Sequence, residues 1–222
     1  MGVARLTIDG NSYVGAFGIA TEKFALLGGA ISAKKHETIE KDLGVAVISA
    51  TIDNSHLVGI YTAANSKGVL LPFTSYHTEV EHIKKKLKEF DVTVLKSDMN
   101  ALRNNILAND KIAVINPEYT RKEEVEIGDA LDVEIVKREI GGFKTVGANN
   151  ILTNTGLVLN NRVDDQEKEE LESIFGMKSE QTTANLGSLN IGLCVMANSR
   201  GVVVGEQTTG FELARITNGL NL

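Results

Sequence analysis

"ANSKGVLLP" at residues 64–72 returns as "ANSRGVVVG" at residues 197–205, and this near-copy decides how the chain must be read. Aligning on the second residue of the string reveals three further copies. The separations between the five copies are 44, 44, 45 and 44 residues. Self-similarity at a fixed period of this length is typical of a repeat architecture. The five aligned positions are Thr21, Asn65, Asn109, Asn154 and Asn198.

A second anchor keeps the same period a few residues upstream. Its five positions are separated by 44, 44, 44 and 45 residues. Two independent anchors with one period predict five units, and we expect them to form one domain over residues 1–222. The upstream positions are Gly15, Gly59, Arg103, Gly147 and Gly192. The approximate unit bounds are 1–43, 44–88, 89–131, 132–175 and 176–222.

Every unit shows the same internal order. A β-rich run comes first, followed by a polar turn and a second strand that ends near the anchor. A turn and an apolar strand follow, and a segment with helical periodicity closes the unit, as Val80, Ile83 and Leu87 show. Four units place a Glu three residues after a capping side chain, which predicts a helix start. These pairs are Thr78 and Glu81, Thr120 and Glu123, Asp164 and Glu167, and Thr209 and Glu212.

A unit of about three strands and one helix has too small a core to fold alone, so it must bury its apolar faces against its neighbours. An open stack of such units would need polar outer faces at both ends. Neither the first nor the last unit is polar in that way. The sequence therefore predicts an α/β fold closed into a pseudo-five-fold ring or propeller, with helices outside and short strands around the axis.

Composition limits the function classes. The 29 acidic residues outnumber the 23 Lys and Arg, which gives a net charge of −6. A protein that binds bare nucleic acid would need a dominant basic surface, so a basic protein partner or a small ligand fits better. The chain has one cysteine, no signal-peptide core and no run of about 18 apolar residues. We therefore expect a cytoplasmic protein without membrane contact.

Longer strings carry a family resemblance. "ATIDNSHLVGIYTAANSKGVLLP" (50–72), "DKIAVINPEYTRKEE" (110–124) and "VGANNILTNTGLVLN" (146–160), in this order, closely resemble the translation initiation factor 6 family. That family is similar to the penteins, which are five-bladed α/β rings. The resemblance implies no catalysis, and we expect a monomer without metal or cofactor. It also implies binding to the intersubunit face of the large ribosomal subunit, through an L14-type ribosomal protein near the sarcin–ricin loop, that keeps the small subunit off.

The ring geometry predicts where such a partner would bind. Residues that follow the upstream anchor converge on one end of the axis, beside the loops 54–56 and 186–188. Arg103 is the only charged residue at that anchor, which indicates either a binding role or an exposed turn that tolerates it. The predicted ribosome-binding residues are Ala16, Ile60, Arg103, Asn104, Ala148, Leu193 and His56.

Several other motifs have two interpretations. Penteins include arginine-modifying enzymes, so the alternative function is a guanidino-modifying enzyme that uses Cys194. The apolar string "NIGLCVMAN" instead favours a buried, inert thiol. His77 and His82 are five residues apart, which does not suit two ligands on one helix face, and no metal site is expected. "IKKKLK" (83–88) fits a solvated helix face, with limited rRNA contact as the open alternative.

Overall fold

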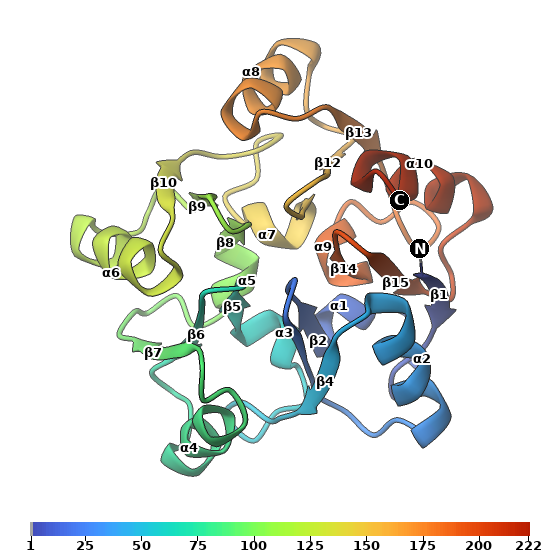
Figure 1. Cartoon of the computed structure of the whole chain (residues 1–222). Helices are drawn as coiled ribbons and strands as arrows, with labels where there is room; N and C mark the ends of the chain where they lie inside the picture. The colour runs from blue at the N-terminus through green and yellow to red at the C-terminus, as the bar shows by residue number, and fades with distance from the viewer. Residues whose placement is uncertain (1) are drawn as a thin grey trace.

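Five three-stranded sheets stand around a common axis in the computed structural model, which describes residues 2–222 (Figure 1). In each sheet the inner and middle strands form an antiparallel hairpin, and the outer strand runs parallel to the middle one. The inner strands are β2 (Gly18–Ala20), β5 (Ala63–Ala64), β8 (Ile106–Ala108), β11 (Ile151–Leu152) and β14 (Val195–Asn198). The middle strands are β3 (Phe24–Leu27), β6 (Gly68–Pro72), β9 (Ile112–Ile115), β12 (Leu157–Asn160) and β15 (Gly201–Gly205).

The outer strand of each sheet comes from the next unit in the chain. The strand that opens unit two, β4, pairs with β3 of unit one, and the same exchange recurs around the ring. This pairing links neighbouring units through backbone hydrogen bonds as well as through apolar contacts. The outer strands are β4 (Ala46–Ser49), β7 (Asp91–Leu95), β10 (Glu134–Lys137), β13 (Ser179–Thr182) and β1 (Gly2–Leu6).

The two ends of the chain close the ring. β1 runs parallel to β15 with a register from Gly2 opposite Gly201 to Leu6 opposite Gly205, so the first strand completes the last sheet. Figure 1 accordingly places the N- and C-termini side by side. The Asn198 carboxamide adds hydrogen bonds from unit five to the carbonyls of Thr21 and Leu43, at 3.0 and 2.8 Å. The predicted closed pseudo-five-fold ring is confirmed.

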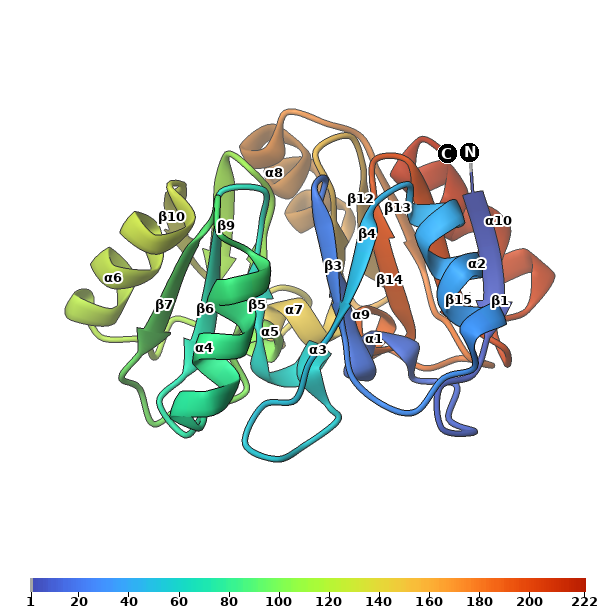
Figure 2. The same cartoon turned by 60° about the horizontal axis from the view of Figure 1, so that its bottom comes forward.

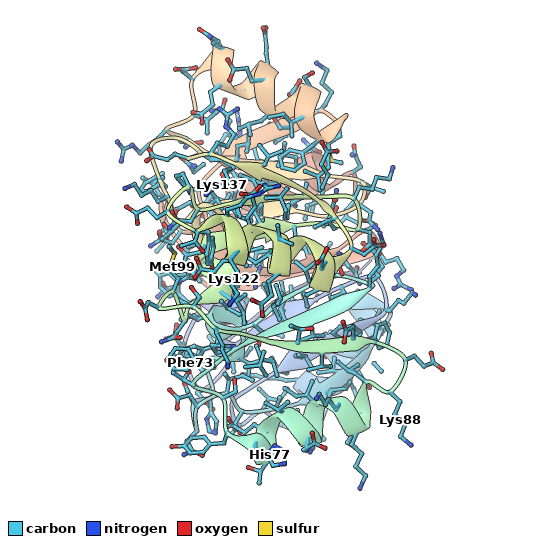
Figure 3. The ribbon with its side chains drawn as sticks, turned by 90° about the vertical axis from the view of Figure 1, so that its left-hand side faces the viewer. Phe73, His77, Lys88, Met99, Lys122 and Lys137 are labelled. Carbon is cyan, nitrogen blue, oxygen red and sulfur yellow. The ribbon has the colours of Figure 1, made fainter. Side chains whose placement is uncertain are left out.

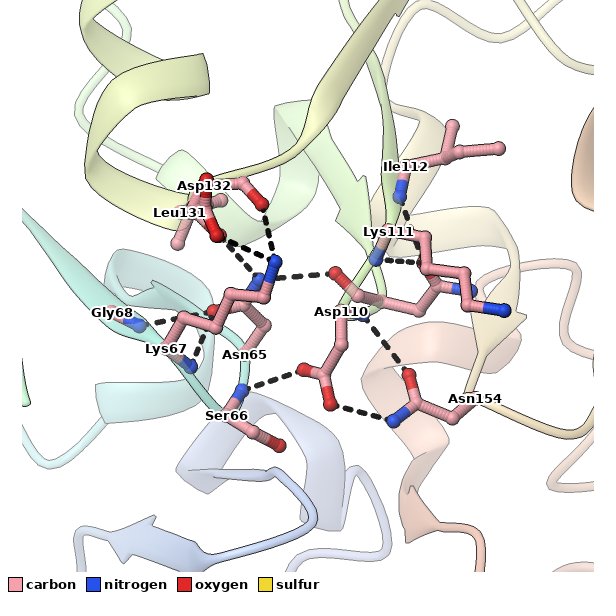
Figure 4. A network of polar contacts seen from close by, with 11 residues as sticks. Asn65, Ser66, Lys67, Gly68, Asp110, Lys111, Ile112, Leu131, Asp132 and Asn154 are labelled. Atoms are coloured by element: carbon pink, nitrogen blue, oxygen red, sulfur yellow. Dashed lines mark hydrogen bonds and ion pairs between the residues drawn. The ribbon is translucent and has the colours of Figure 1, made fainter.

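Asparagine at the downstream anchor has two functions, which Figure 4 shows for Asn65. Its Oδ1 accepts hydrogen bonds from the amides of Lys67 and Gly68, which holds the turn together. Its Nδ2 donates to the carbonyls of Asn109 and Leu131 in the next unit, at 3.1 and 2.8 Å. The residue therefore caps its own turn and ties that turn to its neighbour.

The fourth member of this anchor is Thr153, and the predicted alignment on Asn154 is wrong by one residue. Thr153 Oγ1 accepts from the amides of Thr155 and Gly156, as the asparagine side chains do elsewhere, and its carbonyl accepts from Asn109. With this correction both anchors share the separations 44, 44, 44 and 45. The extra residue lies in the loop bridged by Ala184 and Ser188, which is one residue longer than its counterparts.

One-turn helices at the upstream anchor were not predicted. They lie toward one end of the ring, and the strand turns lie at the other (Figure 2). Each contacts the one before and after it, so the five form an inner ring. A Cβ on Gly59 would lie 2.1 Å from the carbonyl oxygen of Gly15, so the close approach requires glycine. These helices are α1 (Val14–Phe17), α3 (Val58–Tyr61), α5 (Leu102–Asn105), α7 (Val146–Asn149) and α9 (Ile191–Cys194).

Longer helices form the rim, and each lies over the junction between two units. Val80 and Ile83 of the second rim helix pack with Ile19 and Phe24 of unit one, so neighbouring units share a core. This explains why a single unit could not bury its apolar residues. No helix within residues 2–222 is both long and apolar enough to cross a membrane. The rim helices are α2 (Ala33–Leu43), α4 (His77–Lys86), α6 (Arg121–Leu131), α8 (Asp165–Phe175) and α10 (Gly210–Leu220).

Three of the four predicted helix starts are confirmed. Thr120, Asp164 and Thr209 accept a hydrogen bond from the amide of the Glu three residues on. The fourth is wrong, because α4 begins two residues earlier, with Tyr76 as its N-cap and Glu79 at the third position. A competing Glu lies close by in the sequence, and the spacing alone could not choose between the two.

Candidate functional site

The candidate site is the end of the ring that carries the five one-turn helices and the loops before them, here called the short-helix face. The structure brings Ala16, Ile60, Asn104, Ala148 and Leu193 together in these helices. Both alanines are buried, whereas the other three residues are half-buried. The Oδ1 atom of Asn104 is buried without a hydrogen-bond partner among the described residues. The half-buried side chains are those within reach of a partner.

The loops of this face have a common shape in four units. Two or three consecutive residues adopt positive φ, as at Asp9 and Gly10 (49° and 74°) or Asp53 and Asn54 (55° and 54°). Such turns match the twist of a tight hairpin and favour Gly, Asn and Asp. Unit three differs, because no residue of 96–101 adopts positive φ. The same unit carries Arg103 in place of glycine, so its sector of the face departs from the repeat twice.

Glutamates of the rim helices hold these loops in place. The Glu79 carboxylate accepts from the amides of Asp53 and Asn54, at 2.8 and 3.0 Å, and from Thr51 and its own N-cap residue Tyr76. Burial raises the pKa of Glu79, but these hydrogen bonds outweigh it and hold the pKa below its ordinary value of 4.5. Glu167 of α8 and Glu212 of α10 likewise accept from loop amides, so each of these three rim helices fixes the loop beside it through its glutamate.

Glu79 should make the stability depend on pH in acid. Its folded-state pKa lies below the unfolded value, so its contribution is present above about pH 4.5 and is lost as the pH falls through the folded pKa. We expect Glu79→Gln to lower the urea midpoint at pH 7. Between about pH 5 and 3 the urea midpoint of this variant should fall less steeply with decreasing pH than that of the wild type. Glu81→Gln, on the exposed side of the same helix, should leave both features unchanged. A Glu79→Gln profile parallel to the wild-type profile would contradict this assignment.

Exposed apolar side chains gather on the short-helix face. Of the seven large hydrophobic residues that are exposed within residues 2–222, only Val3 and Val125 lie elsewhere. Figure 3 shows Phe73 and Met99 at the end where α4 begins. Because exposed apolar side chains are a feature of interaction sites, this end is the candidate for one. The other five are Tyr13, Phe73, Tyr76, Leu186 and Phe211, of which the last two are 71% exposed.

Sequence reasoning included Leu186 in the loop 186–188 but missed the other four residues. A usable signal was present, because Phe73, Leu186 and Phe211 are large apolar residues within or beside predicted turns. Turns are normally polar, and an apolar residue there has no core to enter.

Acidic groups complete the face. Asp9 and Asp53 are exposed at equivalent loop positions of units one and two, and Asp98 is exposed in the corresponding loop of unit three. His56 is exposed as well, and its Nδ1 lies 3.7 Å from Asp9 Oδ2. The predicted residue His56 therefore lies beside the one-turn helices, on the same face.

Arg103 points into the ring. Its guanidinium donates to the carbonyls of Gly15 and Gly18 of unit one, at 3.1 and 3.0 Å, and to Val195 of unit five at 3.4 Å. It lines an axial cavity of about 40 Å³. Desolvation lowers its pKa to about 10, so the group stays charged at neutral pH. The predicted exposed turn is wrong, and the side chain instead ties three units together across the axis.

Cys194 is buried at the end of α9. Burial raises the pKa of its thiol to about 12, so the thiolate is scarce at neutral pH. A cysteine nucleophile requires the thiolate, and this environment disfavours it. Among residues 2–222 no group of three or more His, Cys, Asp or Glu side chains could hold a metal ion.

Known proteins resemble this chain along its whole length. Translation initiation factor 6 of Pyrococcus horikoshii is 37% identical over 224 residues, which cover 99% of each chain. That of Thermococcus kodakarensis is 39% identical over 225 residues, or 99% of this chain and 98% of its own.

A solved structure shares the fold alone. A dimethylarginine dimethylaminohydrolase variant, in an adduct with S-methyl-L-thiocitrulline, gives a TM-score of 0.50 at 12% identity over 98% of this chain and 95% of its own. The curated relatives named above are initiation factors, whereas this neighbour is an enzyme of the pentein fold. The model of the eIF-6 family matches residues 3–219. The chain therefore belongs to the eIF-6 family and has a role in translation initiation.

Proposed function

We propose that this protein keeps the ribosomal subunits apart by docking its short-helix face on the intersubunit face of the large subunit. The carrying observation is that five of the seven exposed large apolar side chains within residues 2–222 lie at this end of the ring, on units one, two and five. Asn104 lies on α5 and is half-buried, so part of its side chain is exposed to a partner on this face. The proposed contact residues Ile60, Asn104 and Leu193 are on the one-turn helices of this face, and the Arg103 side chain ties α5 to units one and five.

The chemistry of the face suits a basic protein partner near the sarcin–ricin loop, such as an L14-type ribosomal protein. Asp9, Asp53 and Asp98 supply negative charge at the edge, and the apolar side chains supply the contact area. Complementary charge steers association, while buried aromatic groups dominate affinity. An interface of about 1,200–2,000 Å² would hold one copy of the ring in place. The ring would then exclude the small subunit by its bulk, without catalysis.

Co-sedimentation with purified large subunits tests the proposal. We expect the wild-type protein to pellet with the subunit, and Ile60→Asp to weaken binding at least about tenfold, because the carboxylate would be desolvated in an apolar contact. Val125→Asp is the matched control, since Val125 is exposed on α6, away from the face. Binding of Ile60→Asp equal to that of Val125→Asp, with both variants folded, would refute the docking surface.

A further inference from the structure

A run of lysines lies at the C-terminal end of α4, the rim helix of unit two. Lys84, Lys85, Lys86 and Lys88 are all exposed, whereas Ile83 before them and Leu87 between Lys86 and Lys88 are buried. The four lysines therefore lie on the exposed side of the last turn of α4 and at the second residue beyond it. We call these four residues the lysine patch.

The other units provide an internal control for the lysine patch. Lysine near a helix C-terminus complements the helix dipole, and this effect would apply equally to all five rim helices. Yet α6, α8 and α10 have no basic residue in their last turns, and α2 has only Lys41. The other four rim helices therefore form without such a run of lysines. Its presence in unit two therefore calls for another cause.

Charges around the patch leave it positive. Lys84 lies 3.9 Å from Glu81, and no ion pair within residues 2–222 involves the other three lysines. Glu89 and Asp91 follow directly and are also exposed. Lys23, from the strand turn of unit one, lies over the Phe90 ring at 5.7 Å and adds a fifth cation at this corner. Five cations thus face three carboxylates in a protein whose net charge is −6.

The patch lies away from the short-helix face. In Figure 3, Lys88 stands at one end of α4, whereas His77 and Phe73 stand at the other. A partner on the lysine patch would therefore meet the rim and the turn end of the ring. It would leave the docking face of the proposed function free.

We propose that the lysine patch binds the phosphodiester backbone of RNA. Phosphate contacts from lysine need neither a pocket nor a fixed fork geometry, and the patch offers flexible point charges on a convex helix surface. An acidic protein segment would gain little there, because the exposed side of the last turn of α4 presents only charged residues. The contact should be independent of base sequence and strongly dependent on salt. This inference does not depend on the docking proposed above.

Fluorescence anisotropy with a labelled RNA duplex of about 20 base pairs tests it. The full chain should bind at about 50 mM KCl, and the logarithm of the affinity should fall linearly with the logarithm of salt concentration. The variant with Lys84→Gln, Lys85→Gln, Lys86→Gln and Lys88→Gln should bind at least about tenfold more weakly. Its salt slope should be smaller by about 3.6, since each of the four lost phosphate contacts removes about 0.9.

A second variant has the same net charge as the first and serves as its control. It carries Lys34→Gln, Lys41→Gln, Lys111→Gln and Lys122→Gln, which are exposed positions on other units. This control should retain at least about half of the wild-type affinity. Equal losses in both variants would overturn the proposal, because net charge alone would then explain binding. Polyglutamate that competes for the patch as well as unlabelled RNA does would also overturn it.

Discussion

Gly147→Ala is expected to cost the ring at least about 3 kcal/mol of unfolding free energy, which is a large share of the roughly 5–15 kcal/mol of a typical domain. A Cβ at this position would lie 1.9 Å from the carbonyl oxygen of Arg103 and 2.5 Å from that of Ile106. Both atoms are backbone, so no side-chain rotation can relieve the overlap. The helices α5 and α7 would have to separate, and a closed ring cannot widen one junction without straining the others.

Gly210→Ala is the matched control for this substitution. Gly210 opens α10, and a Cβ there would meet nothing within 4 Å. Alanine in a helix is favoured over glycine by up to about 1 kcal/mol, so this variant should be as stable as the wild type or slightly more stable. Urea denaturation measures both changes. Equal midpoints for Gly147→Ala and Gly210→Ala would show that the one-turn helices do not approach as closely as the geometry requires.

The period of the repeat was readable from the sequence because it depends on local chemistry. A turn that needs a side-chain acceptor selects Asn or Thr in every unit, and an apolar strand must follow it. The one-residue error at Thr153 arose because both threonine and asparagine can cap such a turn, and "TNTG" contains both. Only the observed hydrogen bonds identify the residue that does so.

One-turn helices could not be predicted in the same way. Four residues such as "VGAF" (14–17) show no helical periodicity, and a helix this short is unstable in isolation. The five are held by their mutual contacts around the axis, which are tertiary interactions. Glycine at the anchor was visible in the sequence, but its purpose, the close approach of a neighbouring backbone, was not.

The candidate site was partly predictable. Closure of the ring implied that Ala16, Ile60 and Leu193 would meet at one end of the axis, and the structure places them there. The direction of the Arg103 side chain was not implied, because the repeat gave only its position. A long side chain at the inner ring can point outward or across the axis. Here it crosses the axis, where the carbonyls of Gly15, Gly18 and Val195 accept its hydrogen bonds.

Asn104→Lys is expected to abolish the ability of the protein to hold the subunits apart. The residue lies on α5 within the short-helix face, and the buried Asn104 Oδ1 atom is replaced by an ammonium group. Against a basic partner this change brings like charges together. Arg103 keeps α5 in place, so the variant should still fold but should no longer bind the large subunit.

Light scattering during subunit joining is the most direct test of the central claim, that the short-helix face holds the ring where the small subunit would bind. Purified large subunits are incubated with the protein, and small subunits are then added. We predict that one equivalent of wild-type protein or of Val125→Asp prevents the increase in scattering, and that folded Asn104→Lys allows it in full. Joining that proceeds despite the wild-type protein, or that Asn104→Lys blocks equally well, would contradict the account.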